Sequence, residues 1–209
     1  MTCIIGIKLK DEFILGCDSQ LSFGKYIKEY LNHYTDSKIM INREKTGAIG
    51  VCGSASITML KYTPNLFDDF DKQFKYFNYE YVVNKFIYKV YEELKKLNVV
   101  GEEKLNFELP GDIIAISQHK GFYIRSDRFV YEIEDFYAMG SGRDIAEKIL
   151  RLTKDEPDPL KRIILAMKAN TNNTLYVSGD IFYVSSKDYE LKKIDDDLIE
   201  ETMNKYYKK

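Results

Sequence analysis

The sequence predicts an α+β fold in which antiparallel sheets are layered with helices. Strand-like and helix-like segments occur in separate runs along the chain, without the alternation that produces a parallel sheet. Predicted strands such as residues 3–7 are apolar on both faces, as expected for a sheet that is covered on both sides. The chain has 209 residues, a length that suits one hydrophobic core, so we expect a single domain over residues 1–209.

A first β-hairpin is predicted from two apolar, β-branched runs, residues 3–9 and 13–17, which flank a short polar turn centred on Asp11. In an antiparallel pair with this centre, residues whose numbers sum to about 22 face each other. Thr2 therefore lies opposite Asp18 or one of the two residues that follow it. The hairpin brings the beginning of the chain close to a carboxylate.

A second hairpin is predicted from residues 38–42 and 48–52, on either side of a polar turn. Facing residues here sum to about 89, which puts Lys38 opposite Val51 and next to the turn at Gly53. A lysine and a flexible backbone amide thus converge at the open end of this hairpin. If the open ends of the two hairpins lie side by side, four groups form one cluster: Thr2, Asp18, Lys38 and the Gly53 amide.

The later elements are predicted from changes in hydrophobic period. Apolar residues recur at steps of three and four between residues 80 and 97, which indicates an amphipathic helix, and another helix is expected between residues 54 and 77. Helices are also expected to open at residues 140–142 and at Asp158-Pro159, an acidic N-cap followed by a proline at the first helical position. The remaining elements are strands at residues 112–117, 121–125, 129–133, 136–139, 174–178 and 181–185 and a final helix from residue 195.

The charge pattern excludes several classes of partner. The formal net charge is −2 and basic and acidic residues are interspersed, so neither nucleic acid nor an anionic membrane is expected to bind. No apolar run reaches the roughly 18 residues that span a bilayer, and the start of the chain has no secretion signal. We therefore expect a cytoplasmic protein.

The reactive residue types are few. Three cysteines, Cys3, Cys17 and Cys52, each fall in an apolar strand-like run, which predicts buried, reduced thiols. His33 and His119 are the two histidines of the chain, so neither a histidine-rich metal site nor a Ser-His-Asp triad is predicted. We expect no metal and no cofactor.

Five segments, in order and at similar spacing, resemble the signature segments of proteasome β-type subunits and of bacterial relatives such as the peptidase of the HslUV complex. They are residues 2–8, 16–19, 37–39, 50–55 and 137–142. The resemblance runs to about residue 150 and is weaker around residues 179–185. It implies the four-layer αββα sandwich of N-terminal nucleophile hydrolases, a proteasome-like domain over residues 1–209, assembly into a homo-oligomeric ring and an ATPase as a candidate partner.

The resemblance also implies a mechanism. Thr2, exposed by removal of Met1, would be the nucleophile, and its own α-amino group, with an ordinary pKa of about 7.7 to 8.0, would be the base. Lys38 would favour the neutral amine, Asp18 would hold Lys38, and the Gly53 amide would bind the oxyanion. Ser141 would hydrogen-bond the amine. Two further positions match residues that line the family's substrate cleft: Ser22 and Val51.

Each of these residues also has a structural explanation that involves no catalytic role. Asp18 and Lys38 also suit a structural ion pair, Ser141 suits a helix N-cap, and Val51 suits a core position. The family usually carries an aspartate where this chain has an asparagine-rich loop, residues 170–174, so Asn172 would have to replace it. Three functions follow as hypotheses: a threonine peptidase acting on peptides or unfolded proteins, a non-catalytic subunit, and an acyl-transferring amidase or peptide ligase.

Overall fold

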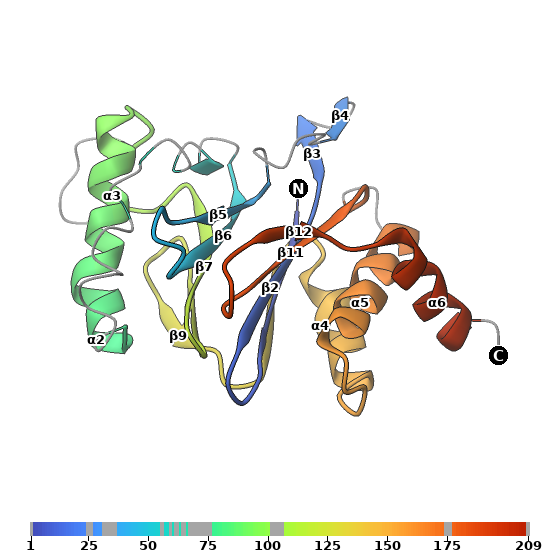
Figure 1. Cartoon of the computed structure of the whole chain (residues 1–209). Coiled ribbons are helices and arrows are strands. Elements are labelled where there is room, and N and C mark those ends of the chain that lie inside the picture. Colours follow the sequence, from blue (N-terminus) through green and yellow to red (C-terminus); the bar gives the residue numbers. More distant parts are fainter. Residues whose placement is uncertain are drawn as a thin grey trace.

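The structure is a computed structural model that describes residues 2–23, 27–30, 37–54, 57–58, 60, 63, 66, 77–100, 107–173 and 177–207. Two five-stranded antiparallel sheets pack face to face in this part of the chain, and helices cover both outer faces (Figure 1). The layers therefore follow the order helix, sheet, sheet, helix. This confirms the predicted α+β sandwich of two antiparallel sheets.

The first sheet combines strands from the beginning of the chain with strands from its second half. Its central strands are the first hairpin, and the C-terminal strands pair with it at one side. In spatial order the strands are β10 (Phe136–Gly140), β1 (Cys3–Lys8), β2 (Phe13–Asp18), β11 (Ile181–Ser185) and β12 (Leu191–Lys193).

The second sheet contains the second hairpin and the strands from the middle of the chain. In spatial order these are β5 (Ile39–Ile41), β6 (Ala48–Gly53), β7 (Gly111–Ser117), β8 (Lys120–Ile124) and β9 (Val130–Glu132). A separate hairpin, β3 (Gln20–Phe23) and β4 (Ile27–Tyr30), extends from the end of β2.

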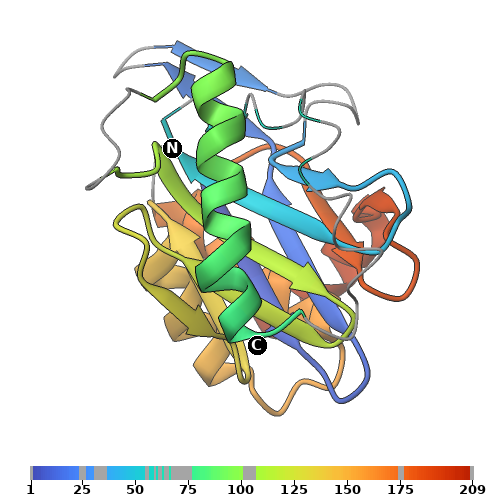
Figure 2. The same cartoon turned by 90° about the vertical axis from the view of Figure 1, so that its left-hand side faces the viewer.

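A continuous helical segment crosses the outer face of the second sheet (Figure 2). It consists of α2 (Tyr79–Tyr81), a π-helical turn (Val82–Phe86) and α3 (Ile87–Lys96). Asn78 caps it, because its Oδ1 accepts a hydrogen bond from the Tyr81 amide at 2.9 Å. The described residues contain no helix that is both long and apolar enough to cross a membrane.

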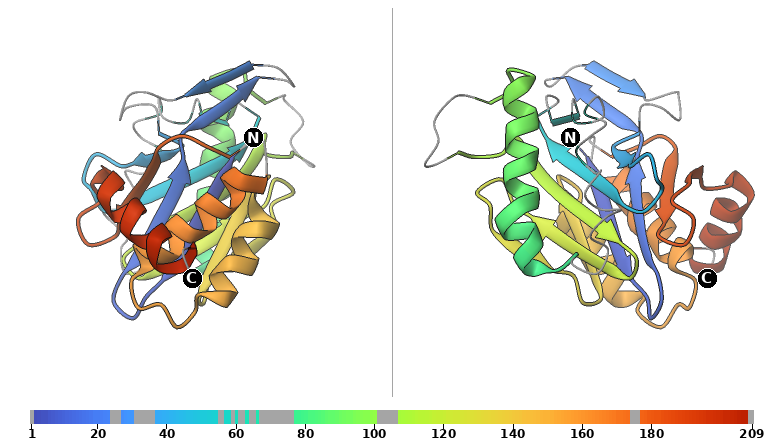
Figure 3. Two further views of the ribbon diagram at one scale, coloured as in Figure 1. Left: turned by 90° about the vertical axis from the view of Figure 1, so that its right-hand side faces the viewer. Right: turned by 60° about the vertical axis from the view of Figure 1, so that its left-hand side comes forward.

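Three helices cover the outer face of the first sheet (Figure 3). They are α4 (Arg143–Leu152), α5 (Pro159–Asn173) and α6 (Asp196–Tyr207). The side chain of Asp158 caps α5 as predicted, since its Oδ1 accepts a hydrogen bond from the Leu160 amide at 2.9 Å.

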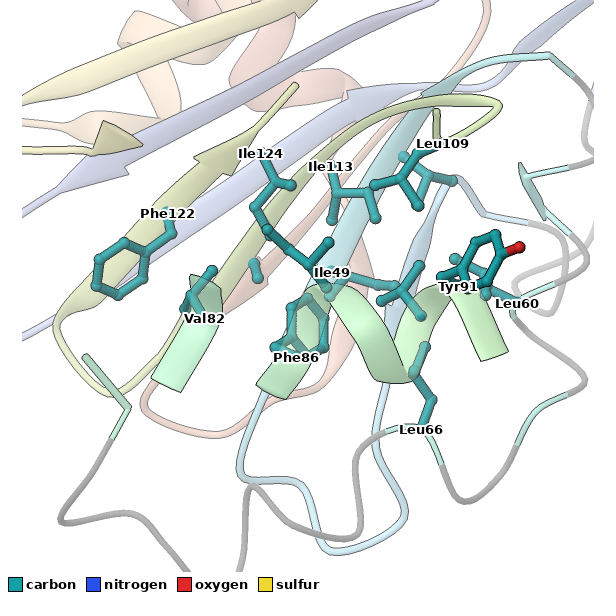
Figure 4. Close-up of a cluster of buried hydrophobic side chains, with 14 of the residues drawn as sticks. Ile49, Leu60, Leu66, Val82, Phe86, Tyr91, Leu109, Ile113, Phe122 and Ile124 are labelled. Atoms are coloured by element: carbon teal, nitrogen blue, oxygen red, sulfur yellow. The ribbon is translucent and has the colours of Figure 1, made fainter. Parts of the chain in front are cut away.

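Apolar side chains fill each of the three spaces between the layers. One cluster lies between the second sheet and the helical segment of residues 79–96, and it contains Phe86 together with Ile49 and Ile113 of the sheet (Figure 4). A second cluster lies between the sheets and a third between the first sheet and α4 and α5. This arrangement explains why β1 is apolar on both faces: its side chains alternate between the second and third clusters.

Phe13 determines how closely the two sheets approach each other. Its ring is fully buried, and two glycines leave room for it. A Cβ atom on Gly121 would lie 2.3 Å from the ring, and one on Gly6 would lie 2.9 Å from it. The two sheets can close over Phe13 only because these positions lack side chains.

The predicted hairpins are confirmed in register. Ile39 faces Gly50 as expected, and Ile4 faces Cys17, one position from the predicted sum. The predicted loop at residues 170–174 is wrong for residues 170–173, which form the last turn of α5; the buried face of that helix continues as far as Asn170. Strands β3, β4 and β12 were not predicted. Residues 177–178 are not in a strand, and most of the helix expected between residues 54 and 77 lies outside the described residues.

Replacing Gly121 by alanine tests the closeness of the sheets. We expect Gly121→Ala to lower the free energy of unfolding by about 1 to 3 kcal/mol, because the new methyl group overlaps the Phe13 ring. Adding Phe13→Leu should relieve this overlap, so that the double variant is more stable than the sum of the single effects predicts. Urea unfolding monitored by circular dichroism measures all three variants. Additive effects would contradict this packing.

Candidate active site

A cavity of about 600 Å³ opens where the ends of the two hairpins meet. Thr2, Gly53 and Ser141 all line it, and they come from the beginning of the chain, the end of β6 and the segment between β10 and α4. Figure 2 and Figure 3 show the N-terminal end of the chain beside the end of β6. The sheet packing thus brings together the two hairpin ends that the sequence left unconnected.

Asp18 and Lys38 form a buried ion pair between the sheets. Asp18 ends β2 in the first sheet, and Lys38 directly precedes β5 in the second sheet. The Lys38 Nζ donates a hydrogen bond to Asp18 Oδ1 at 2.7 Å, and both side chains are almost fully buried. The Cys3 amide donates to the same oxygen at 2.8 Å, and the Gln20 amide donates to Oδ2 at 3.2 Å.

The buried position of this pair shifts the pKa of Asp18, and the pair also holds the neighbouring backbone in place. Burial raises the pKa of the Asp18 carboxyl above its usual value, and the Lys38 ammonium and the two backbone amides oppose that rise. The bond from the Cys3 amide also fixes the backbone immediately after Thr2. The pair therefore contacts the backbone of Cys3, the residue that follows Thr2, the predicted nucleophile.

Ser141 holds the backbone of Thr2 from the other side. Its Oγ accepts a hydrogen bond from the Thr2 nitrogen at 3.2 Å and lies 3.3 Å from the Thr2 carbonyl oxygen, to which it donates. Ser141 is not the N-cap of α4, because Gly142 occupies that position and no side chain caps the helix. In the printed sequence the Thr2 nitrogen is the amide of the Met1–Thr2 bond, and removal of Met1 would make it an amine.

Two glycines shape the walls of the cavity. Gly140 has a φ angle of +90°, and a Cβ atom there would lie 2.2 Å from the Thr2 carbonyl oxygen. Gly53 has a φ angle of +134°, and a Cβ atom there would lie 2.5 Å from the Gly111 Cα. Both positions require glycine, since residues with a side chain rarely adopt such φ angles and the neighbouring backbone leaves no space for a Cβ atom.

The cysteines near the cavity are poor alternative nucleophiles. Cys52 lines the cavity, but burial raises the pKa of its thiol to about 12. Burial also raises the pKa of the Cys3 thiol, which is fully enclosed beside Thr2. A thiol reacts as its thiolate, so neither sulfur is activated at neutral pH. All three cysteines are buried and unbridged, as predicted.

Of the two predicted substrate-binding residues, Val51 is not among the described residues that line this cavity. The Val51 side chain is 1% exposed and packs in the cluster beneath α3, which agrees with the alternative that it is a core residue. Ser22 lies in β3 opposite Lys28, and its side chain is outside the described residues. Asn172 is exposed on α5, which does not suit a residue that supports the nucleophile.

Asn170, which was not singled out in the sequence, is the buried asparagine of α5. Its Nδ2 donates to the Ala166 carbonyl at 3.0 Å and lies 3.9 Å from Cys3 Sγ. Its buried Oδ1 has no hydrogen-bond partner among the described residues and lies against Gly142. The sequence does indicate that Asn170 is buried, because it has the helical spacing that places it on the same face as Ile163 and Met167.

Removing one partner of the Asp18–Lys38 ion pair should strongly lower the stability of the fold. Lys38→Met leaves Asp18 buried without its counter-ion, so we expect the free energy of unfolding to fall by about 3 to 5 kcal/mol. The double variant Asp18→Asn/Lys38→Met should recover part of this loss, because no buried charge remains. Urea unfolding at neutral pH measures both.

The matched control is Lys8→Met, which removes a lysine from the more exposed pair with Glu134. The expected loss there is under about 1 kcal/mol. Equal losses for Lys8→Met and Lys38→Met would show that the buried pair does not stabilise the fold.

Comparisons with solved structures extend the description of the fold. BPH from Thiobacillus denitrificans in complex with epoxomicin is 18% identical, with a TM-score of 0.66 over 88% of this chain and 97% of that chain. A mutant of Anbu from Hyphomicrobium sp. strain MC1 is 14% identical, with a TM-score of 0.71 over 100% of this chain and 95% of that chain.

HslV from Trypanosoma brucei is 20% identical, with a TM-score of 0.60 over 88% of this chain and 98% of that chain. No protein-family model matches the sequence, and no curated protein matches it. These likenesses concern the fold. The chain has the fold of proteasome-like N-terminal nucleophile hydrolases.

Proposed function

We propose that this protein is an N-terminal threonine peptidase that hydrolyses amide bonds through an acyl-enzyme on Thr2 after Met1 is removed. One observation carries the proposal: the Thr2 nitrogen is held by the Ser141 hydroxyl at the wall of a cavity, directly in front of the buried Asp18–Lys38 pair. Once Met1 is removed, the proposed site combines a nucleophile, a base on the same residue and a fixed positive charge.

Thr2 needs to be the first residue of the mature chain, because its own α-amino group is the proposed base. A threonine hydroxyl is a weak nucleophile at neutral pH and needs a proton acceptor within hydrogen-bond reach. An α-amino group has an ordinary pKa of about 7.7 to 8.0, so a large fraction is neutral near pH 8 and can accept the proton. Lys38 favours the neutral amine by repulsion, and Ser141 orients it.

The reaction proceeds in two stages. The Thr2 Oγ attacks the substrate carbonyl carbon while its proton moves to the Thr2 amine, and the Gly53 amide donates to the resulting oxyanion. A donor of this kind is typically worth about 3 to 4 kcal/mol. The tetrahedral intermediate then collapses, the leaving amine takes the proton, and an ester remains on Thr2. Water attacks the ester with the Thr2 amine again as the base, which releases the carboxylic acid and free enzyme.

The substrate is proposed to be a peptide or an unfolded protein, and the working form a homo-oligomeric ring, with an ATPase as a candidate partner. These proposals follow from the resemblance of the five sequence segments and from the shared fold. A cytoplasmic location and a single domain over residues 1–209 remain proposals of the same kind.

A non-catalytic subunit is the second candidate function. The observation that favours it is the chemistry of α5, where the buried residue next to Cys3 is the neutral Asn170 and Asn172 is exposed. No carboxylate of α5 reaches the described part of the site. Catalysis by Thr2 would then depend on Lys38 and Ser141 alone for support of the amine.

Replacement of Thr2 tests the proposed function. We expect the mature wild-type protein to lack the mass of Met1 and to cleave unstructured peptides, and Thr2→Ala to lose activity by at least about 1000-fold, because the nucleophile is gone. Thr2→Ser, which keeps a hydroxyl group, should retain measurable cleavage. Intact mass spectrometry and a fluorogenic peptide assay provide the measurements. Full activity in Thr2→Ala or in protein that retains Met1 would refute the mechanism.

Hydrolysis and acyl transfer are separated by their products. With an added amine acceptor at millimolar concentration, we expect the free acid to remain the main product, because the cavity is open to water. Liquid chromatography with mass detection measures the ratio of acid to new amide. A predominance of the new amide would assign the protein to acyl transfer instead.

A further inference from the structure

A second cavity of about 340 Å³ adjoins the cavity at Thr2. The two share Tyr123 and Arg143 as lining residues, so they lie side by side on either side of these side chains. The second cavity is lined by strands β8, β9 and β10 and by helix α4. Its distinctive groups are arginines and tyrosines: Arg125, Arg143, Arg151, Tyr123, Tyr131 and Tyr137.

The arginines outnumber the carboxylates that face them. Arg143 Nε donates to Glu147 Oε1 at 3.0 Å, and Arg151 Nη2 lies 3.9 Å from Glu147 Oε2, so one carboxylate serves two guanidinium groups. Arg125 is paired separately with Asp127. These three arginines and two carboxylates leave one positive charge at the second cavity, whereas the carboxylates of Glu108 and Asp112 line the neighbouring cavity at Thr2. The Arg143 and Arg151 side chains are 45% and 72% exposed, so their guanidinium groups are accessible to a ligand.

Aromatic rings orient the arginines: Arg143 lies over a tyrosine, and Arg151 lies over Phe136. The Arg143 guanidinium lies over the Tyr137 ring at 4.9 Å from its centroid, and Tyr137 packs against Tyr123 with ring centroids 4.3 Å apart. Tyr123 is in turn fixed by a hydrogen bond from its hydroxyl to Asp112 at 2.9 Å. A guanidinium group stacked on an aromatic ring loses little conformational entropy when it binds a planar carboxylate.

Strand β10 connects the two cavities. Tyr137 lies at the second cavity, and four residues later Ser141 contacts Thr2. At 3.3 Å per residue this spacing is about 13 Å, the length of roughly four residues of an extended peptide. For an extended peptide that runs alongside β10 from an amide bond at Thr2, a side chain three to five residues away would therefore lie at the second cavity.

We propose that the second cavity binds an aspartate or glutamate side chain of the substrate peptide, three to five residues from the bond that is cleaved. This inference rests on the proposed function of Thr2 and adds a preference for acidic peptides to it. Arg143 and Arg151 bind the carboxylate, and the tyrosines position it. The contact is partly exposed to solvent, so its contribution should decrease as the salt concentration rises.

Binding to the Thr2→Ala variant tests the inference without relying on cleavage. Fluorescently labelled peptides that carry one aspartate are compared with peptides that carry asparagine at the same position, by anisotropy at low salt. We expect about three- to fivefold tighter binding of the aspartate peptides. This ratio should fall to about one in Arg143→Gln/Arg151→Gln. It should persist in Arg43→Gln, which removes an exposed arginine of the β5–β6 turn far from the cavity in sequence.

Cleavage by the wild-type protein then gives the position of the aspartate relative to the cleaved bond. Equal binding of aspartate and asparagine peptides would overturn the inference while leaving the role of Thr2 intact. A preserved binding ratio without any cleavage would overturn the role of Thr2 instead. If the double arginine variant keeps the ratio but changes the oligomeric state in light scattering, the arginines contact a neighbouring copy and the inference is wrong.

Discussion

The buried ion pair between Asp18 and Lys38 is the interaction on which the rest of the site depends. It joins the end of β2 in one sheet to the residue before β5 in the other, and in the described part of the chain these strands belong to separate sheets that do not share hydrogen-bonded strand pairs. Burying two charges is costly unless their remaining hydrogen-bonding capacity is used, and here backbone amides complete the coordination of the carboxylate. The pair therefore fixes the two hairpin ends relative to each other, and with them the backbone that follows Thr2.

Other contacts also hold the backbone of Thr2 in place, in addition to the ion pair. Ser141 and Gly142 donate to the Thr2 carbonyl, and Gly140 leaves the space that this carbonyl occupies. The residue is held from two sides through its backbone, while the cavity lies in front of it. A side chain on a backbone fixed in this way is preorganised, which is what a nucleophile and its base require.

Much of the fold followed from local sequence pattern. The registers of both hairpins, the amphipathic helix of residues 80–97 and the start of α5 at Pro159 depend on neighbouring residues and were predicted from them. The meeting of the two hairpins was only an assumption, because the packing of one sheet on another is decided by contacts distant in sequence, such as Phe13 against Gly121. Strand β4 escaped prediction since its residues, including Lys28 and Glu29, lack a clear alternating pattern. Strand β3 alternates over only four residues, Gln20–Phe23, and so gives a weak signal.

The candidate site was predictable to a similar extent. Thr2 and Asp18 converge by register alone, whereas Lys38, Gly53 and Ser141 joined them chiefly through the resemblance to the proteasome family. Asn170 was missed because the helix was ended too early, which hid its place on the buried face. The arginine and tyrosine cavity could not be foreseen, because its residues come from three strands and a helix that share no local pattern.

The most direct test of the central claim is to trap the nucleophile. A peptide epoxyketone forms a stable ring with an N-terminal residue that offers both a hydroxyl and a free amine, so incubation with the mature protein should add one inhibitor mass, mapped to Thr2 by tandem mass spectrometry. The Thr2→Ala variant should remain unmodified. An adduct on another residue, or none in protein that has lost Met1, would contradict the assignment of Thr2 as the nucleophile.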